Sequence, residues 1–279
     1  MRPITSLTVQ AFAKINLDLR VLGVRPDGYH ELRTTFQSIA LADVLTFTRT
    51  RGPFRIECDD PACPTGRTNL VWKAAASVWK AAGRTGALRG VTVRIEKNIP
   101  MQAGLGGGSS DAAATLGALT TLWRATLPAG QLQQIAASLG ADVPYFLEGG
   151  TALGFSRGDI LFPLDDISRA WVVVIVPGFG VSTKDAFGWW DAEHAPTRRT
   201  ASNDLEKVVA KRHPIVSRLV GALKREGAFH ASLSGSGSAV FGLFSRRSEA
   251  QAAARLLAGP RTFVTPTLTR RACRRLAAK

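Results

Sequence analysis

The chain has 279 residues, of which 45% are hydrophobic and 20% charged, and its formal net charge is +15. This length is near the size at which one hydrophobic core gives way to two lobes. Three cysteines are too few for a disulfide framework, and the most apolar run, residues 170–176, is too short to cross a bilayer. We therefore expect a globular protein that does not associate with a membrane.

The opening residues 1–5 lack the apolar core of a signal peptide, so a soluble cytoplasmic protein is expected. The positive charge could serve RNA binding or attract anionic substrates. The basic residues are dispersed and are not interleaved with aromatics, which favours small anions, and we expect no nucleic-acid partner. Cys58 and Cys63 could form half of a metal site, but no second pair has zinc spacing. They are interpreted as reduced cysteines in a polar loop.

Apolar periodicity predicts the elements of the first half of the chain. Residues 7–21 alternate apolar and polar side chains, which indicates a half-buried strand, and Pro26 and Gly28 mark a turn. Further strands are predicted at 44–47 and 91–95, with a helix at 69–82 between them. The strand at 91–95 leads into a glycine-rich segment.

The second half mixes helices and strands without a regular alternation. Helices are predicted at 110–123 and 131–139, then a hairpin at 151–162, a strand at 171–176, helices at 184–191, 204–212 and 215–226, strands at 231–233 and 239–244, a helix at 249–257 and a strand near Thr267. The pattern is typical of an α+β fold. We place a domain boundary between residues 162 and 163, giving domains 1–162 and 163–279.

The strongest chemical signal is the glycine-rich segment between the strand at 91–95 and the helix at 110–123. It consists of Pro100, Met101, Gln102, Ala103, Gly104, Leu105, Gly106, Gly107, Gly108, Ser109 and Ser110. Glycine lets a backbone approach a ligand closely, and a helix N-terminus attracts negative charge. A flexible surface loop would not explain a strand, a glycine run, two serines and an alanine-rich helix in that order. The segment therefore predicts a phosphate site.

Three familiar phosphate-binding patterns do not fit. A P-loop requires a lysine before its Ser/Thr, and none precedes Ser109. A dinucleotide fingerprint needs a third glycine where Ser109 stands, and an acidic residue near position 127. The His-Arg-Asp and Asp-Phe-Gly motifs of protein kinases are absent. The cation and the base must come from other parts of the chain.

The glycine-rich segment resembles the central motif of the GHMP kinases, which include galactokinase, homoserine kinase and mevalonate kinase. Further matches occur in order at 13–17, 25–31, 140–144, 177–183, 203–206 and 233–238, so the resemblance covers nearly the whole chain. It implies a two-lobed fold, with an N-terminal ATP-binding lobe similar to a ribosomal-protein domain and a ferredoxin-like C-terminal lobe. It also implies ATP as co-substrate, with Mg²⁺ bridging its phosphates.

The resemblance assigns roles to residues that alone would be unremarkable. It implies that Asp142 is the general base and that Lys14 lies beside it, where an ammonium would offset charge on the transferred phosphoryl group. Asn16 falls on the same strand face as Lys14 and can orient the substrate. Asn69 and Lys97 match positions near the adenine and phosphates. The Mg²⁺ ligands are not identified, although Ser109 and Ser110 are candidates.

Within the family, the motifs match the branch whose acceptor is a methylerythritol linked to cytidine diphosphate, phosphorylated on its 2-hydroxyl in the non-mevalonate isoprenoid pathway. The resemblance implies that Tyr29 and His30 hold the cytosine by stacking and by contact with its polar edge. Thr183 and Phe187 are four residues apart, so a helix would present them together. They are expected to line the same pocket, although each could instead serve packing.

Two alternatives remain open at this point. Another GHMP kinase could act on a mevalonate-like or homoserine-like alcohol, although Tyr29, His30 and Phe187 argue for a base in the substrate. A non-enzymatic RNA-binding protein would suit the charge of +15 but leaves Lys14 and Asp142 without a role. The oligomeric state is not evident from the sequence, and a monomer or weak homodimer is expected.

Overall fold

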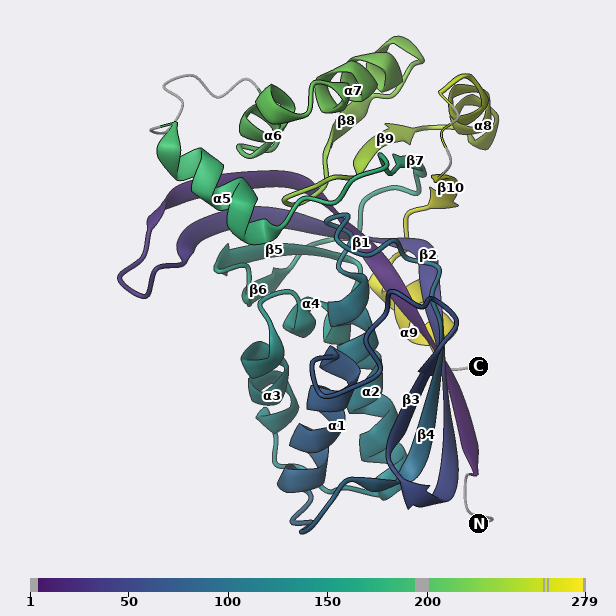
Figure 1. Cartoon of the computed structure of the whole chain (residues 1–279). Coiled ribbons are helices and arrows are strands. Elements are labelled where there is room, and N and C mark those ends of the chain that lie inside the picture. The colour runs from purple at the N-terminus through teal and green to yellow at the C-terminus, as the bar shows by residue number, and fades with distance from the viewer. Residues whose placement is uncertain (1–4, 194–200, 258, 260, 278–279) are drawn as a thin grey trace.

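The computed structural model describes residues 5–193, 201–257, 259 and 261–277. Residues 1–4, on which the expectation of a missing signal peptide partly rests, lie outside this range. The described chain forms two sheets with helices packed against each (Figure 1). Within these residues no helix is long and apolar enough to cross a membrane.

The first sheet is built on one long hairpin. Strand β1 (Ser6–Val24) pairs antiparallel, along its whole length, with residues 30–48 of β2 (His30–Pro53). The other strands are β3 (Arg55–Cys58), β4 (Arg89–Glu96), β5 (Thr151–Ser156) and β6 (Ile160–Pro163). The order is β3-β4-β2-β5-β6, with β1 on β2.

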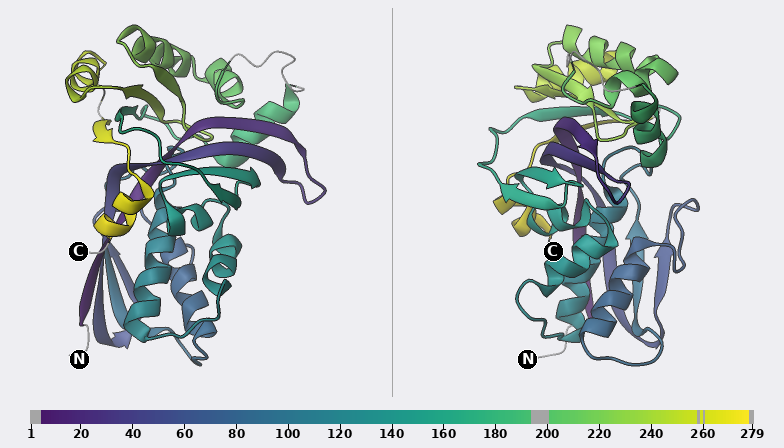
Figure 2. Two further views of the ribbon diagram at one scale, coloured as in Figure 1. Left: turned by 180° about the vertical axis from the view of Figure 1, so that it is seen from behind. Right: turned by 90° about the vertical axis from the view of Figure 1, so that its left-hand side faces the viewer.

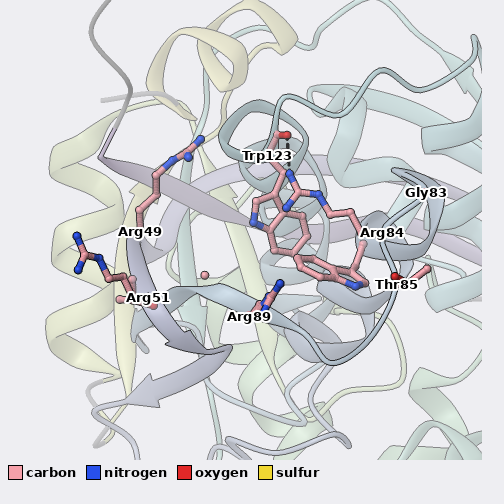
Figure 3. A pocket seen from close by; sticks show the side chains of 10 residues that line it. Arg49, Arg51, Gly83, Arg84, Thr85, Arg89 and Trp123 are labelled. Carbon is pink, nitrogen blue, oxygen red and sulfur yellow. Dashed lines mark hydrogen bonds between the residues drawn. The ribbon is translucent and has the colours of Figure 1, made fainter.

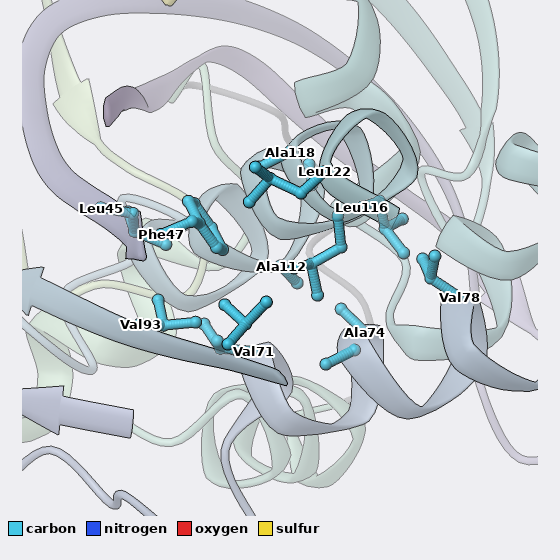
Figure 4. Close-up of a cluster of buried hydrophobic side chains, with 14 of the residues drawn as sticks. Leu45, Phe47, Val71, Ala74, Val78, Val93, Ala112, Leu116, Ala118 and Leu122 are labelled. Atoms are coloured by element: carbon cyan, nitrogen blue, oxygen red, sulfur yellow. The ribbon is translucent and has the colours of Figure 1, made fainter. Parts of the chain in front are cut away.

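Four helices cover one face of this sheet: α1 (Leu70–Ala81), α2 (Gly107–Trp123), α3 (Gln131–Leu139) and α4 (Val143–Glu148). Between them and the sheet lies a core to which Leu45, Phe47, Val71 and Leu116 contribute, all fully buried (Figure 4). Burying each such side chain stabilises the fold by about 1.5–3 kcal/mol. This core fixes α2 against the sheet and so fixes the segment that precedes it.

The second sheet has the order β10-β7-β9-β8. Its strands are β7 (Trp171–Ile175), β8 (His230–Leu233), β9 (Val240–Phe244) and β10 (Thr262–Pro266). The helices of this part are α5 (Thr183–Ala192), α6 (Glu206–Arg212), α7 (Ile215–Arg225) and α8 (Arg247–Leu256). The last helix, α9 (Arg270–Ala277), returns to the first sheet and packs on β1 through Cys273 and Phe12.

The hairpin joins the two parts, passing between the second sheet and α4 (Figure 2). Asp204 accepts hydrogen bonds from the Val21 amide at 3.0 Å and from the Arg20 guanidinium at 2.8 Å. Leu19 of β1 forms an isolated bridge with Asn203. Hydrogen bonds from a buried carboxylate to both backbone and side chain hold the strand in one register against the segment that precedes α6.

The predicted α+β class and most elements are confirmed, with four differences. The strand predicted at 44–47 is part of a strand that begins at His30, and the helix predicted from 110 begins at Gly107. The half-buried alternation predicted for β1 is wrong between Ala11 and Asn16, where every residue is buried. The strand β3 and the helices α4 and α9 were not predicted. The boundary at 162/163 stays a prediction.

Candidate active site

Every second residue in the middle of the glycine-rich segment is buried and hydrogen-bonded to another part of the chain. Ala103 and Leu105 are 2% and 1% exposed and belong to the core between the sheets. Their carbonyls accept hydrogen bonds from the amides of Ala239 and Lys14, both at 3.0 Å. Gly104 and Gly106 have φ of +75° and +73°, a region that only glycine adopts readily. The segment is therefore an ordered element held between β1 and β9.

Helix α2 begins in the middle of the glycine run. Gly107, Gly108 and Ser109 form its first turn, whose amides have no acceptor inside a helix. Together with the positive end of the helix dipole, these amides can bind phosphate oxygens. The Ser110 hydroxyl is buried and donates to the carbonyl of Phe12 at 2.7 Å, so it faces β1. The Ser109 hydroxyl is the freer candidate ligand.

Lys14 and Asn16 lie side by side on β1, as their spacing predicts. Lys14 is 3% exposed, and its ammonium donates to Asn16 Oδ1 at 2.6 Å. Asn16 in turn donates to the hydroxyl of Thr34 on β2 at 2.7 Å. The aliphatic stem of Lys14 passes the glycine run, since a Cβ on Gly106 would lie 3.2 Å from Lys14 Cγ. A buried ammonium thus lies next to the candidate phosphate cradle.

Asp142 lies at the N-cap position of α4, and a turn from Gly140 presents it, with the Val143 amide donating to the Gly140 carbonyl at 3.1 Å. An aspartate at this position usually accepts a bond from its own helix. Here the carboxylate makes no such bond, and Oδ2 lies 3.4 Å from the Lys14 ammonium. Its side chain is 32% exposed. The predicted neighbourhood of Lys14 and Asp142 is therefore present.

A turn between β8 and β9 closes the site from the other side. Ser234 donates to the Gly104 carbonyl at 3.0 Å, and a Cβ on Gly235 would lie 3.3 Å from both Lys14 Nζ and Asn16 Oδ1. Asn203 holds the turn by donating to the Gly235 carbonyl at 2.7 Å. The sequence motifs at 203–206 and 233–238 contained these residues, but the predicted site did not include them.

Beside the tip of the β1–β2 hairpin, His30 and Phe187 meet directly. Their ring centroids are 4.5 Å apart with an interplanar angle of 21°. The imidazole Nε2 of His30 is 2.8 Å from Asp191 Oδ1, and its ring meets Trp190 edge-on at 5.7 Å. Figure 1 shows the tip of the β1–β2 hairpin beneath α5. Asp191 was not predicted, although its spacing of four from Phe187 places both on one face of α5.

Tyr29 and Thr183 lie nearer to solvent. Tyr29 is 56% exposed, and the Arg157 guanidinium lies 5.1 Å from its ring centroid. The Thr183 hydroxyl is 3.3 Å from that of Ser236, in the turn that touches Lys14. The site therefore runs from the glycine segment through Lys14 and the Ser236 turn to the first turn of α5.

Asn69 and Lys97 have local partners. Asn69 caps α1 by accepting from the Val71 amide at 2.8 Å. Lys97 lies behind the glycine run, where a Cβ on Gly107 would be 3.1 Å from its ammonium. The ammonium is buried and pairs with Asp43 and with Asp111, the latter at 2.8 Å. These contacts stabilise the elements around the cradle, and the nucleotide role of both residues stays a prediction.

The carboxyl of Asp111 makes stability depend on pH. Burial raises the pKa of Asp111 to about 7, and the like charge of Asp43 acts in the same direction. The Lys97 ammonium acts in the opposite direction. In the unfolded chain an aspartate has a pKa of about 4. Between about pH 4 and pH 7, Asp111 is therefore protonated only in the folded state. The stabilisation is complete below about pH 4 and is lost as the pH rises through about 7, by up to about 1.4 kcal/mol per pH unit.

We therefore expect Asp111→Asn to flatten the pH dependence of unfolding. The amide stays neutral and keeps an oxygen for the Lys97 ammonium, which donates to Asp111 Oδ2. Urea unfolding measured across this pH window should give a smaller slope for the variant than for the unmodified chain. Asp165→Asn, at an exposed carboxylate, is the control and should keep the original slope. Equal slopes for Asp111→Asn and the unmodified chain would contradict the assignment.

The cysteines are free in the described structure. Cys58 is the last residue of β3, so of the two cysteines only Cys63 lies in the predicted loop, where it is buried. Burial raises the pKa of the Cys63 thiol to about 12, with a further contribution from Cys58. Among the described residues, no group of three or more His, Cys, Asp or Glu could hold a metal ion.

Comparison with known proteins places this fold and site in a class. The model of the GHMP kinase N-terminal domain matches residues 69–150, and that of the C-terminal domain matches residues 193–259. The first match includes the glycine segment and Asp142. A homoserine kinase from Cytophaga hutchinsonii has the same fold, with a TM-score of 0.67 over 96% of this chain and 99% of its own at 18% identity.

More similar proteins narrow the class. The 4-diphosphocytidyl-2-C-methyl-D-erythritol kinase of Moorella thermoacetica is 42% identical over 94% of this chain and 99% of its own, and that of Solibacter usitatus is 42% identical over 96% and 90%. A crystal structure of 4-(cytidine 5'-diphospho)-2C-methyl-D-erythritol kinase matches with a TM-score of 0.79 and 35% identity, over 94% and 99%. This chain belongs to the 4-diphosphocytidyl-2-C-methyl-D-erythritol kinase family of GHMP kinases. The prediction of a small-molecule kinase is confirmed, and the RNA-binding alternative is set aside.

Proposed function

We propose that this protein transfers the γ-phosphoryl group of ATP to the 2-hydroxyl of 4-diphosphocytidyl-2-C-methyl-D-erythritol, giving the 2-phosphate and ADP in the non-mevalonate isoprenoid pathway. The observation that carries the proposal is the pairing of Lys14 with Asp142 at 3.4 Å beside the glycine segment, in a chain 42% identical to kinases of that name. We further propose that it works in the cytoplasm as a monomer or weak homodimer.

In this proposal, the residues act by position and charge, as is general for phosphoryl transfer. Asp142 accepts the proton of the attacking hydroxyl. Lys14, buried and held by Asn16, neutralises negative charge that gathers on the transferred group. The free amides at the start of α2 bind the phosphates of ATP. Because Lys14 also contacts Asp142, base and cation meet the same reacting group.

Mg²⁺ would bridge the ATP phosphates and neutralise part of their charge. The Ser109 hydroxyl, in the first turn of α2, fits as a ligand because it is not engaged by β1 as Ser110 is. Since the described residues form no cluster of three or more acidic, His or Cys ligands, phosphate oxygens and water would supply most of the coordination shell.

The cytidine end of the acceptor would lie at the tip of the hairpin. Phe187 is half-buried and stacked on His30 by one face, so its other face can stack on a pyrimidine. Asp191 holds Nε2 of His30, which fixes the ring and leaves Nδ1 for the polar edge of the base. Tyr29, 56% exposed, can supply a second ring. Thr183 would contact the acceptor near the Ser236 turn.

The test is ADP release with the cytidylated acceptor, with mevalonate and with homoserine. We expect turnover of the first alone, and turnover of mevalonate without the cytidylated alcohol would overturn the proposal. Phe187→Ala should raise the KM for the cytidylated acceptor about tenfold, because one aromatic contact with a base contributes about 1–3 kcal/mol. The KM for ATP should not change.

Phe229→Ala is the matched control, since Phe229 is 63% exposed and lies in the turn between α7 and β8. It should alter neither KM. If Phe187→Ala and Phe229→Ala had the same small effect on the KM for the acceptor, Phe187 would not contact the base. The kinase assignment is tested separately, by the ADP-release assay alone.

A further inference from the structure

A pocket of about 610 Å³ opens at the far end of α2 from the glycine segment. Its walls come from the end of β2, the loop between α1 and β4, and the start of β4. The residues lining it are Arg49, Thr50, Arg51, Trp79, Gly83, Arg84, Thr85, Arg89, Gly90 and Trp123 (Figure 3). Four are arginines and none is acidic. Helix α2 has 17 residues and is about 25 Å long, so this pocket is separate from the candidate active site.

The backbone opens the pocket by an irregular strand pairing. On β2 and β4, Arg49 pairs with Val91 and Pro53 with Arg89, so three residues of β2 lie opposite one residue of β4. A bulge of this kind bends the strand and re-aims its side chains. It leaves Arg51 and Arg89 at the rim, both exposed. Figure 3 shows that Arg51 points away from the other labelled arginines, Arg49, Arg84 and Arg89.

Two of the arginines also stabilise the fold. Arg84 donates to the Trp123 carbonyl at 3.0 Å, and Arg49 donates to the Leu122 carbonyl. These carbonyls end α2, where a helix has unpaired acceptors and a negative dipole end. The Arg84 guanidinium also lies over the rings of Trp79 and Trp123, at 5.0 and 5.5 Å from their centroids. Arg49 and Arg84 are thereby held in place.

The charge around the pocket has one sign. From residue 44 to 56 the chain has three arginines and no acidic residue, and from 61 to 95 it has six basic residues and none that are acidic. Elsewhere Lys97 and Arg20, for example, pair with carboxylates. In addition, the indole nitrogen of Trp79 is buried without a hydrogen-bond partner. A concave surface with unopposed arginines concentrates anions.

We propose that this pocket is a second anion-binding site, for a compact ligand that carries two or more phosphate groups. One arginine can bind two phosphate oxygens at once, and several arginines lining one pocket match a diphosphate better than a single charge. A volume of about 610 Å³ suits a small molecule rather than a nucleic-acid strand, which needs an extended groove with exposed rings for stacking. Trp79 and Trp123 are 8% and 7% exposed and are covered by Arg84.

The test uses inorganic pyrophosphate and a readout local to the pocket. Of the six tryptophans in the chain, Trp79 and Trp123 line the pocket, whereas Trp171 and Trp189 belong to the other part of the molecule. In a two-dimensional ¹H–¹⁵N spectrum, assigned with Trp79→Phe, the Trp79 indole signal should shift saturably as pyrophosphate is added. Pyrophosphate bound at the glycine segment would be about 25 Å away and would leave this signal in place.

Arg51→Ala combined with Arg89→Ala should raise the midpoint of this titration about tenfold or more, because each substitution removes a charge-assisted hydrogen bond to the anion. The control removes the same charge from exposed positions of the other part, Arg218→Ala with Arg261→Ala, and should change the midpoint little. An unchanged Trp79 signal in the unmodified chain would overturn the proposal. So would equal midpoints in the two variants, or a short DNA strand that shifts the signal at lower concentration than pyrophosphate.

Discussion

Asp142→Asn is expected to lower kcat by about 10²- to 10⁴-fold, which is the usual contribution of a positioned general base. The amide cannot accept the proton of the acceptor hydroxyl, but it has nearly the same shape. Its oxygen can keep the contact that Asp142 Oδ2 makes with the Lys14 ammonium at 3.4 Å. Since α4 receives no capping bond from this side chain, the fold should be unaffected.

The affinity for ATP should change little, because the glycine segment and the start of α2 do not touch Asp142 in the contacts seen here. Single-turnover phosphoryl transfer and direct ATP titration separate the two quantities. Asp165→Asn removes an exposed carboxylate and should leave kcat unchanged. A kcat for Asp142→Asn within about threefold of the unmodified enzyme would exclude Asp142 as the base.

Gly104→Ala is expected to have the largest effect on stability. A Cβ at this position would lie 2.0 Å from the Ser234 carbonyl oxygen and 3.0 Å from the Gly237 amide nitrogen. Both are backbone atoms of the turn between β8 and β9, so no side chain can move aside. The residue also has a φ of +75°. We expect the free energy of unfolding to fall by about 3 kcal/mol or more, within the range of severe substitutions.

Separation of the glycine segment from that turn should also weaken ATP binding and lower kcat. Urea unfolding and ATP titration measure the two effects. Gly117→Ala, in the interior of α2, is the control because a Cβ there would meet no atom within 4 Å. It should stabilise the protein by up to about 1 kcal/mol, the usual gain from alanine in a helix. Equal urea midpoints for Gly104→Ala and the unmodified protein would contradict the expected clash.

Local sequence patterns predicted the elements in which buried apolar side chains recur with the period of a helix or of a strand. Helix α5 was expected at 184–191 and runs from Thr183 to Ala192, and the hairpin expected at 151–162 forms β5 and β6. Strand β2 was mostly missed because its buried side chains include polar ones, such as Thr34, Gln37 and Asp43. Their hydrogen-bond partners come from distant segments, so alternation of apolar residues does not mark them.

Helix α9 was missed for the opposite reason. It is rich in arginine and has one buried residue, Cys273, whose contact with β1 joins the two ends of the sequence. The site shows the same division. The pairing of Lys14 and Asn16 follows from strand periodicity, whereas the contact of His30 with Asp191 joins residues 161 positions apart. No pattern within one element contains that contact.

The sequence by itself predicted a phosphate cradle, because a glycine run before an alanine-rich helix places free backbone amides at a helix N-terminus. Its ordered motifs also identified the family. Only the tertiary structure decided that the Lys14 ammonium is buried and held by Asn16, that Asp191 holds His30, and that several arginines line a second pocket without an acidic residue. The reason is physical: a motif fixes local backbone geometry, while burial and charge depend on which distant segments fold against it.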